Sequence, residues 1–260
     1  MTRRTCLLAF VTLCVPAAVM AQSAATDLAR GDAARAALDP PAALSAYMAA
    51  IAADSSNGTA YWKAALTLLD MGKLTPDSVP SPARDSLYAR AEVLAKRAVV
   101  LEPKSPDAYF VLANAIGRAA LTKSRKERVR RAVEIQQDAL TAIGLDQSHD
   151  GAYHVLGRWN AEIMRLSGTE RFFAKSFMGG GVFGEASWNN AQMYMLRAVT
   201  LNPNLIYHRL DLGLVYVDVG NYPAAREQFE VIATLPVTDV GDPMYKQDAA
   251  TMMTKIAGRK

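Results

Sequence analysis

Apolar residues recur along the chain at offsets of four and then three. Five segments share this pattern, in which a small or aliphatic residue is followed by two further apolar positions. The five triplets are Ala43/Tyr47/Ala50, Ala91/Ala95/Ala98, Ile135/Ala139/Ala142, Ala191/Met195/Ala198 and Ala225/Phe229/Ile232. Offsets of three and four place side chains on one face of an α-helix. The pattern therefore predicts five helices, and alanine at several positions predicts close packing by a neighbouring helix.

A second set of helical positions follows each of the first four triplets. Its copies are Tyr61/Ala64/Ala65/Leu68, Tyr109/Leu112/Ala113/Ile116, Tyr153/Leu156/Gly157 and Arg209/Leu212/Gly213/Tyr216. The last repeat resembles the tetratricopeptide pattern, a helix hairpin repeated every ~34 residues. The residues that carry this resemblance are Leu212, Gly213, Tyr216, Gly220, Tyr222, Ala225, Phe229 and Pro236. We therefore predict an all-α fold, a right-handed superhelical solenoid of tetratricopeptide-like helix hairpins with insertions.

The spacing of the repeats predicts where the insertions lie. Only the step from Ala191 to Ala225 has the expected length, and the excess in earlier steps falls between the two helices of a hairpin. Such insertions lie on one side of a solenoid and can cover part of its groove. The repeat domain is expected over residues 41–260, with a terminal capping helix near residues 243–258. Asp242 could cap that helix, with Pro243 in its first turn.

The N-terminal 21 residues are typical of an export signal. Arg3 and Arg4 precede an apolar run that ends at Met20, and small residues suit cleavage after Ala21, before Gln22. A membrane anchor is the alternative, but the run is shorter than the ~18–20 residues of a spanning helix and contains a proline. We expect an exported, periplasmic or secreted protein. The Ala-rich residues 22–40 would then form a capping helix or a flexible entry.

Cleavage would leave a mature chain without cysteine, because Cys6 and Cys14 both lie in the export signal. Disulfides, thiol catalysis and cysteine metal ligands would then be excluded. The 260 residues carry a formal net charge of +4, of which Arg3 and Arg4 supply two. So small an excess does not indicate a nucleic-acid partner, and export would separate the protein from the genome.

One short segment is nevertheless strongly basic. Its cationic residues are Lys123, Arg125, Lys126, Arg128, Arg130 and Arg131. Such a run could bind phosphate groups of a lipid or a nucleic acid. We favour a solvated helix face, because Glu127 lies four residues before Arg131 and can support it.

No catalytic or cofactor-binding arrangement is evident. The run Gly179–Gly184 formally matches a dinucleotide fingerprint, but that motif needs a preceding strand, and residues 170–178 are predicted to be helical. The run is therefore interpreted as a loop in the longest insertion. The phenylalanines around it either pack the insertion against the solenoid or face a ligand; they are Phe172, Phe173, Phe177 and Phe183. His149, His154 and His208 form no metal-binding pattern, so we predict neither a cofactor nor an enzyme.

Two stretches go beyond the general repeat. The first is His154-Val155-Leu156-Gly157-Arg158-Trp159, continuing through Leu166-Ser167, Glu170-Arg171 and Phe177; the second is Leu235-Pro236 followed by Asp242 and a final helix. Over residues 42–258 the chain thereby resembles the regulator of microtubule dynamics family. The resemblance implies a non-enzymatic helical binding domain, and one animal member of the family binds phospholipid through it. An exported protein would meet no microtubules, so the resemblance implies a curved receptor for a peptide or a lipid tail.

The first helix of each hairpin would line the concave face of the solenoid. Residues at i, i+4 and i+8 share a helix face. This gives a stripe of Trp62, Leu66 and Asp70; Phe110, Asn114 and Arg118; His154, Arg158 and Glu162; Leu210, Leu214 and Asp218. Arg118 and Arg158 could offer donor forks to a carboxylate or phosphate. Alternatively, they pair with Glu162 or Asp218, and the apolar members of the stripe are buried by the insertions.

These observations favour an adaptor that binds a peptide or protein partner in its concave groove. The alternative is a carrier or sensor of a lipid or other apolar ligand. An open polar groove would favour the adaptor and an enclosed apolar cavity the carrier. We expect no nucleic-acid partner, whereas contact with a membrane surface is possible.

Overall fold

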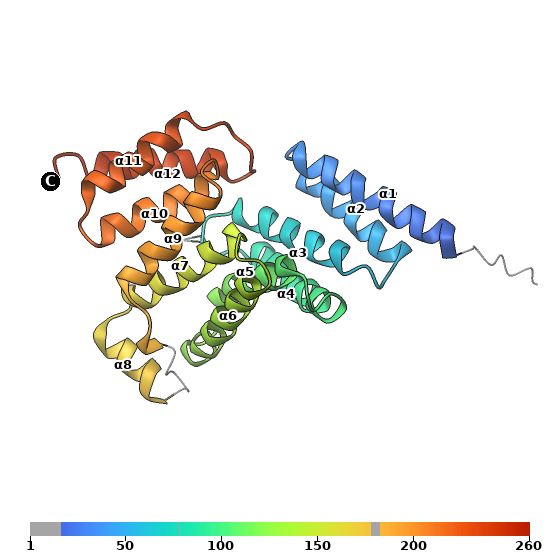
Figure 1. Ribbon diagram of the computed structural model, residues 1–260, viewed down its shortest axis with the longest axis horizontal. Helices are drawn as coiled ribbons and strands as arrows, with labels where there is room; N and C mark the ends of the chain where they lie inside the picture. Colours follow the sequence, from blue (N-terminus) through green and yellow to red (C-terminus); the bar gives the residue numbers. More distant parts are fainter. Residues whose placement is uncertain (1–16, 78, 178–182) are drawn as a thin grey trace, which may run out of the picture.

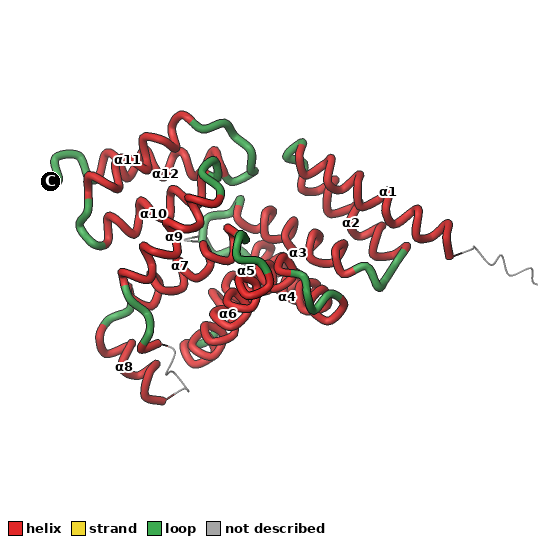
Figure 2. Tube along the Cα trace, in the orientation of Figure 1, coloured by secondary structure: helices red, strands yellow, loops and turns green. Residues whose placement is uncertain are grey.

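The computed structural model describes residues 17–77, 79–177 and 183–260, and within these it contains helices and no strand. The helices are α1 (Ala17–Ala36), α2 (Pro40–Ala53), α3 (Gly58–Lys73), α4 (Pro82–Leu101), α5 (Pro106–Ala119), α6 (Arg125–Leu145), α7 (Asp150–Arg165), α8 (Gly168–Phe177), α9 (Trp188–Leu201), α10 (Ile206–Asp218), α11 (Tyr222–Thr234) and α12 (Asp242–Lys255). A short 3₁₀ turn, Ala120–Thr122, follows α5. Loops join the helices throughout (Figure 2). The prediction of an all-α fold is confirmed.

The helices form hairpins that stack in chain order (Figure 1). The pairs are α1 with α2, α3 with α4, α5 with α6, α7 with α9, and α10 with α11, and α12 packs on the last pair. Residues 22–36 lie in α1, which packs on α2. Gly31 lets α1 approach α2 closely, since a Cβ atom there would lie 2.4 Å from the Tyr47 ring. The predicted helical-repeat solenoid is the observed architecture.

The five sequence triplets lie in the second helix of each hairpin. Every alanine of the triplets is fully buried. Tyr47, Met195 and Phe229 each pack against a glycine in the first helix of their own hairpin, namely Gly31, Gly157 and Gly213. Polar side chains accept a backbone N–H in the first turn of most helices; they are Asp39, Asn57, Ser81, Ser105, Ser124, His149, Ser187 and Asn221. Each cap satisfies an N–H group that has no partner inside its helix. Local sequence thus determines where the helices start and which face they bury.

The longest insertion joins α7 to α9 and contains α8. The segment before the glycine run is helical, as predicted, whereas Met178 and residues 179–182 of the run lie outside the described residues. Phe183 is buried and stacks on Trp159, with ring centroids 6.0 Å apart. Trp159 also donates a hydrogen bond of 2.7 Å from Nε1 to the carbonyl of Ala132 in α6. These contacts pack the end of the insertion against the solenoid.

The C-terminal segment differs from the expectation in one detail. Asp242 is the first residue of α12 and does not cap it. Its Oδ2 instead accepts the backbone N–H groups of Thr238 and Asp239, each at 2.8 Å. The prediction of Asp242 as the helix cap is therefore wrong, because the carboxylate turns back to the preceding loop. Pro243 does occupy the first turn of α12, as predicted.

The loop before α12 crosses to the opposite part of the solenoid. Lys73, at the end of α3, lies 2.7 Å from Asp239 and 2.8 Å from Asp70. Figure 1 shows this loop beside the C-terminal end of α3. The contact joins residues that are 166 positions apart in the sequence. It therefore brings the terminal helix to the edge of the concave face.

Candidate binding cavity

A cavity of about 2370 Å³ occupies the concave side of the solenoid. The first helices α3, α5, α7 and α10 supply much of its wall, and α12 with its preceding loop adds Asp239 and Tyr245. Nine of the ten predicted groove residues line it: Leu66, Phe110, Asn114, Arg118, His154, Arg158, Glu162, Leu210 and Leu214. Helical periodicity accounts for this agreement, because residues four apart face the same side of a helix.

Trp62 is the exception. Its side chain does not line the cavity but packs, partly buried, against the hydrophobic cluster formed by α3, α4 and α5. The ammonium of Lys63 lies 5.5 Å from its ring centroid. A large indole near the start of α3 gains more from contact with neighbouring helices than from exposure to the cavity.

The two arginines of the stripe meet carboxylates that the sequence did not indicate. Nη1 of Arg118 donates a hydrogen bond of 2.8 Å to Asp77, which belongs to the insertion between α3 and α4. Nη1 of Arg158 lies 3.7 Å from Oδ2 of Asp211 in α10. The expected pairing with Glu162 or Asp218 is wrong for both.

Glu162 and Asp218 instead pair with Arg165, at 2.7 Å and 2.6 Å. Arg165 lies three residues after Glu162 in α7 and does not belong to the i, i+4, i+8 series, so the stripe did not include it. Asp211 likewise follows the stripe residue Leu210 directly. A prediction that covered a broader face of each helix would have included Arg165 and Asp211.

Asp211 is the centre of a small ionic network. Nε2 of His154 lies 2.8 Å from its Oδ2, on the same oxygen that faces Arg158. Burial opposes ionisation of this carboxyl, but the charge of Arg158 and the contact with His154 outweigh it and hold the pKa of Asp211 well below its usual range. Asp211 is therefore ionised at neutral pH and balances Arg158.

Several polar groups of the wall have unused hydrogen-bonding capacity. Within the part of the chain that the structure describes, neither the Asn114 amide nor the hydroxyls of Tyr207 and Tyr245 have a hydrogen-bond partner, although all three line the cavity. Burial raises the pKa of both tyrosines, so both hydroxyls stay protonated and can donate. Arg158 also makes no hydrogen bond to a described residue, and 42% of its side chain is exposed.

The sequence analysis missed both tyrosines for identifiable reasons. Tyr207 lies four residues before Asp211, on a face of α10 adjacent to the stripe, so the i, i+4 rule would have found it from Asp211. Tyr245 belongs to the terminal helix, and no repeat pattern places that helix against the groove.

One section of the wall is apolar. Trp159, Ile163 and Phe183 form a buried cluster there, with Val129 packed against it. Lys126 and Arg128 are exposed and also line the cavity near this section. The cavity thus has a polar part, around Asn114, Arg158 and the tyrosines, and an apolar part where α6, α7 and the insertion meet.

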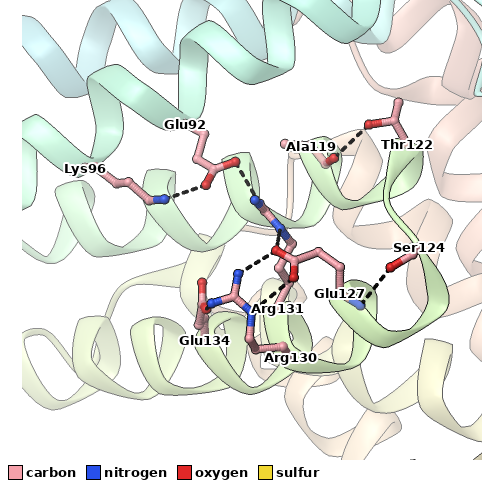
Figure 3. A network of polar contacts seen from close by, with 9 residues as sticks. All are labelled: Glu92, Lys96, Ala119, Thr122, Ser124, Glu127, Arg130, Arg131 and Glu134. Atoms are coloured by element: carbon pink, nitrogen blue, oxygen red, sulfur yellow. Dashed lines mark hydrogen bonds and ion pairs between the residues drawn. The ribbon is translucent and has the colours of Figure 1, made fainter.

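Two arginines of the basic segment of α6, Arg130 and Arg131, form ion pairs (Figure 3). Glu127 accepts hydrogen bonds from Arg131 at 3.1 Å and from Arg130 at 2.5 Å. Nη1 of Arg131 reaches Glu92 of α4 at 2.7 Å, and Glu92 also binds Lys96. The predicted Glu127–Arg131 pair is confirmed, and the network of Figure 3 joins neighbouring hairpins.

Each histidine contacts an aspartate of a neighbouring hairpin. The pairs are His149 with Asp107 at 3.4 Å, His154 with Asp211 at 2.8 Å, and His208 with Asp150 at 3.0 Å. His208 is completely buried, and burial lowers its pKa to about 4. The described residues contain no group of three or more His, Cys, Asp or Glu side chains placed to hold a metal ion.

The stacked hairpins, their small-residue contacts and the concave cavity define a helical-repeat protein of the tetratricopeptide type. The family model "Regulator of microtubule dynamics protein 1-3" matches residues 27–257, and the chain belongs to this family. The resemblance drawn from the sequence is thereby confirmed. The sequence matches no curated protein.

Solved structures show the same fold at low sequence identity. TTC0263, a thermophilic TPR protein of Thermus thermophilus, is 16% identical with a TM-score of 0.64, over 88% of this chain and 99% of that one. PilF of Pseudomonas aeruginosa is 12% identical with a TM-score of 0.53, over 92% of each chain. At these identities the likeness concerns the fold. Among the described residues, no helix has the length and apolar character needed to cross a membrane.

Proposed function

We propose that this protein is a non-enzymatic adaptor that binds a segment of a partner protein in its concave cavity. The volume of about 2370 Å³ exceeds the ~300–1,000 Å³ of most small-molecule pockets. Helical-repeat solenoids offer such extended concave surfaces to extended or helical segments. A peptide of several residues is therefore the ligand whose size suits the cavity.

The observation that carries the proposal is the set of unused polar groups on the wall. Asn114 can both donate and accept, as can the hydroxyls of Tyr207 and Tyr245. A peptide main chain offers donors and acceptors in alternation, which such groups can pair. The cations in the polar part of the wall already face carboxylates of the protein, as in the pairs Arg118–Asp77 and Arg158–Asp211. A free phosphate would have to compete with these carboxylates, whereas neutral amides would not.

A random linear peptide library displayed on phage provides a direct test. A selected peptide should bind with an affinity that falls about two- to tenfold in Asn114→Ala, the range expected for one lost hydrogen bond. Asn204→Ala is the matched control, because Asn204 is exposed and does not line the cavity. Failure to select any peptide, or equal effects of the two variants, would refute the proposal.

A second function, carriage of a lipid or other apolar ligand, is favoured by one observation. The apolar section of the wall, with Trp159, Ile163 and Phe183, lies near the exposed cations Lys126 and Arg128. That arrangement suits an amphipathic anion. Native mass spectrometry of the protein purified from its own envelope would distinguish the two functions. A carrier should retain a bound lipid, whereas an adaptor should retain a bound polypeptide.

We also propose that the protein is exported after cleavage behind Ala21. The packing of α1 supports this, because cleavage would remove only the first five residues of the helix. The residues of α1 that pack on α2, including Leu28 and Gly31, would remain. N-terminal sequencing should find Gln22 at the start of the mature chain. An intact Met1 on cytoplasmic protein would exclude export.

A further inference from the structure

The outer surface of the solenoid separates its charges along the chain. The outer helices are the second members of the hairpins, α2, α4, α6, α9 and α11. Among their described side chains, every exposed charged residue of the first four helices is basic: Arg90, Lys96, Arg97, Lys126, Arg128, Arg130 and Arg197. On α11 the exposed charged residues are both acidic, Glu227 and Glu230.

The clearest basic surface is one stripe on α4. Arg90, Val93, Arg97 and Val100 follow one another at steps of three and four residues and are all exposed, and Lys104 lies exposed just beyond the end of the helix. Val93 and Val100 are 68% and 69% exposed, the highest values among the large apolar side chains described. No residue of the stripe lines the cavity. Valine on a solvated surface is unfavourable, so the stripe has the character of an unpaired helix seam.

The carboxylates of α4 do not neutralise this stripe. Asp85 accepts hydrogen bonds from Arg84, and Glu92 binds Arg131 and Lys96. Glu102, which follows the helix, accepts hydrogen bonds from Thr59 of α3. In the described part of the chain, Arg90, Arg97 and Lys104 have no ion-pair partner. The stripe therefore presents two unbalanced arginines beside two exposed valines, with the charge of Lys104 just beyond it.

The outer face of α11 is its counterpart. Pro223, Glu227, Glu230 and Thr234 follow one another at steps of four, three and four residues and are all exposed, and Val237 lies exposed three residues beyond the end of the helix. Glu227 and Glu230 form no ion pair with a described residue, and Val237 is 45% exposed. The same molecule thus carries two exposed helix faces of opposite charge. Figure 1 shows α4 and α11 in different parts of the solenoid, so one chain does not pair them with each other.

We infer that the α4 stripe binds the α11 face of a second copy of this chain. Glu227 and Glu230 would face the arginines of the stripe. The contact joins two different surfaces, so it is heterologous and extends head to tail instead of closing as a symmetric dimer. A single pair of helix faces lies at the small end of protein interfaces, so the association should be weak and sensitive to salt.

Sedimentation velocity over a range of protein concentrations tests this inference. The weight-average mass of the full protein should rise with concentration at low salt and return to that of the monomer in 1 M salt. Arg97→Glu and Glu230→Arg should each raise the dissociation constant by about tenfold or more, because like charges would then face each other. An equimolar mixture of the two variants should associate again, because each supplies the charge that the other reversed.

Arg197→Glu is the matched control, since Arg197 is an exposed cation of another outer helix, α9. It should associate like the unchanged protein. Circular dichroism checks that each variant keeps its helices. A weight-average mass that stays at the monomer value at every concentration would overturn the inference. The stripe would then be a candidate site for an acidic partner other than this chain. Association that neither reversal weakens, or that the mixture does not restore, would overturn it equally.

Discussion

Replacement of Gly213 by alanine tests how closely α10 and α11 pack. A Cβ atom at this position would lie 2.4 Å from Cε1 of Phe229, 2.8 Å from Cζ and 3.0 Å from Cδ1. Phe229 is only 2% exposed, so its ring has little room to move. Overpacking of this kind costs about 1–3 kcal/mol, whereas alanine in place of a helical glycine gains about 0.5–1 kcal/mol. The net expectation is a loss of roughly 1 kcal/mol.

Gly117→Ala is the matched control on another first helix. A Cβ atom there would have Ile135 Cδ1 as its nearest neighbour, at the ordinary contact distance of 3.6 Å. Only the helix-propensity gain remains, so this variant should be more stable than the parent by up to about 1 kcal/mol. The change from glycine to alanine is therefore expected to lower the free energy of unfolding at position 213 and to raise it at position 117.

Thermal unfolding followed by circular dichroism measures both effects. For a chain of this size, about 1 kcal/mol corresponds to a change in Tm of roughly 2–4 °C. Gly213→Ala should melt below the parent protein and Gly117→Ala at or above it. Adding Phe229→Leu to Gly213→Ala should cost less than the sum of the single effects, because leucine relieves the clash. A rise in Tm for Gly213→Ala equal to that of Gly117→Ala would refute the packing argument.

Three further predictions follow from the same contacts. Ala198 is fully buried in α9, so Ala198→Leu should lower the free energy of unfolding by about 1–3 kcal/mol, and an unchanged melting curve would contradict the repeat register. Burial lowers the pKa of His208 to about 4, so the neutral form is favoured in the folded state and stability is lost as the pH falls from 6.5 towards 4. Urea unfolding should show a loss between pH 7 and pH 5 that is roughly 2 kcal/mol larger than in His208→Gln; equal losses would place His208 in a solvated environment. Arg158→Ala should weaken the selected peptide about two- to tenfold with an unchanged helical spectrum, and Arg158→Lys should recover part of the loss. A destabilised fold with unchanged affinity would make Arg158 a structural partner of Asp211.

The helices, their order and most of the groove follow from the sequence alone. The triplets such as Ala91/Ala95/Ala98 identify buried helix faces because helical periodicity is a property of neighbouring residues. By the same reasoning, ten groove residues were predicted, and nine of them line the cavity. The extra length of the early repeats also predicted insertions between the two helices of a hairpin, and these are observed between α3 and α4, between α5 and α6, and between α7 and α9.

The ion pairs of the cavity, and the part of its wall that α12 supplies, depend on contacts between distant segments of the chain. Arg118 meets Asp77 from an insertion, Arg158 meets Asp211 from the next hairpin, and Tyr245 comes from the terminal helix. Lys73 and Asp239 join positions 166 residues apart. Periodicity says which side of a helix a residue occupies, but not which loop or distant helix lies opposite. That depends on the curvature of the whole stack, which arises from many small side-chain contacts summed over five hairpins.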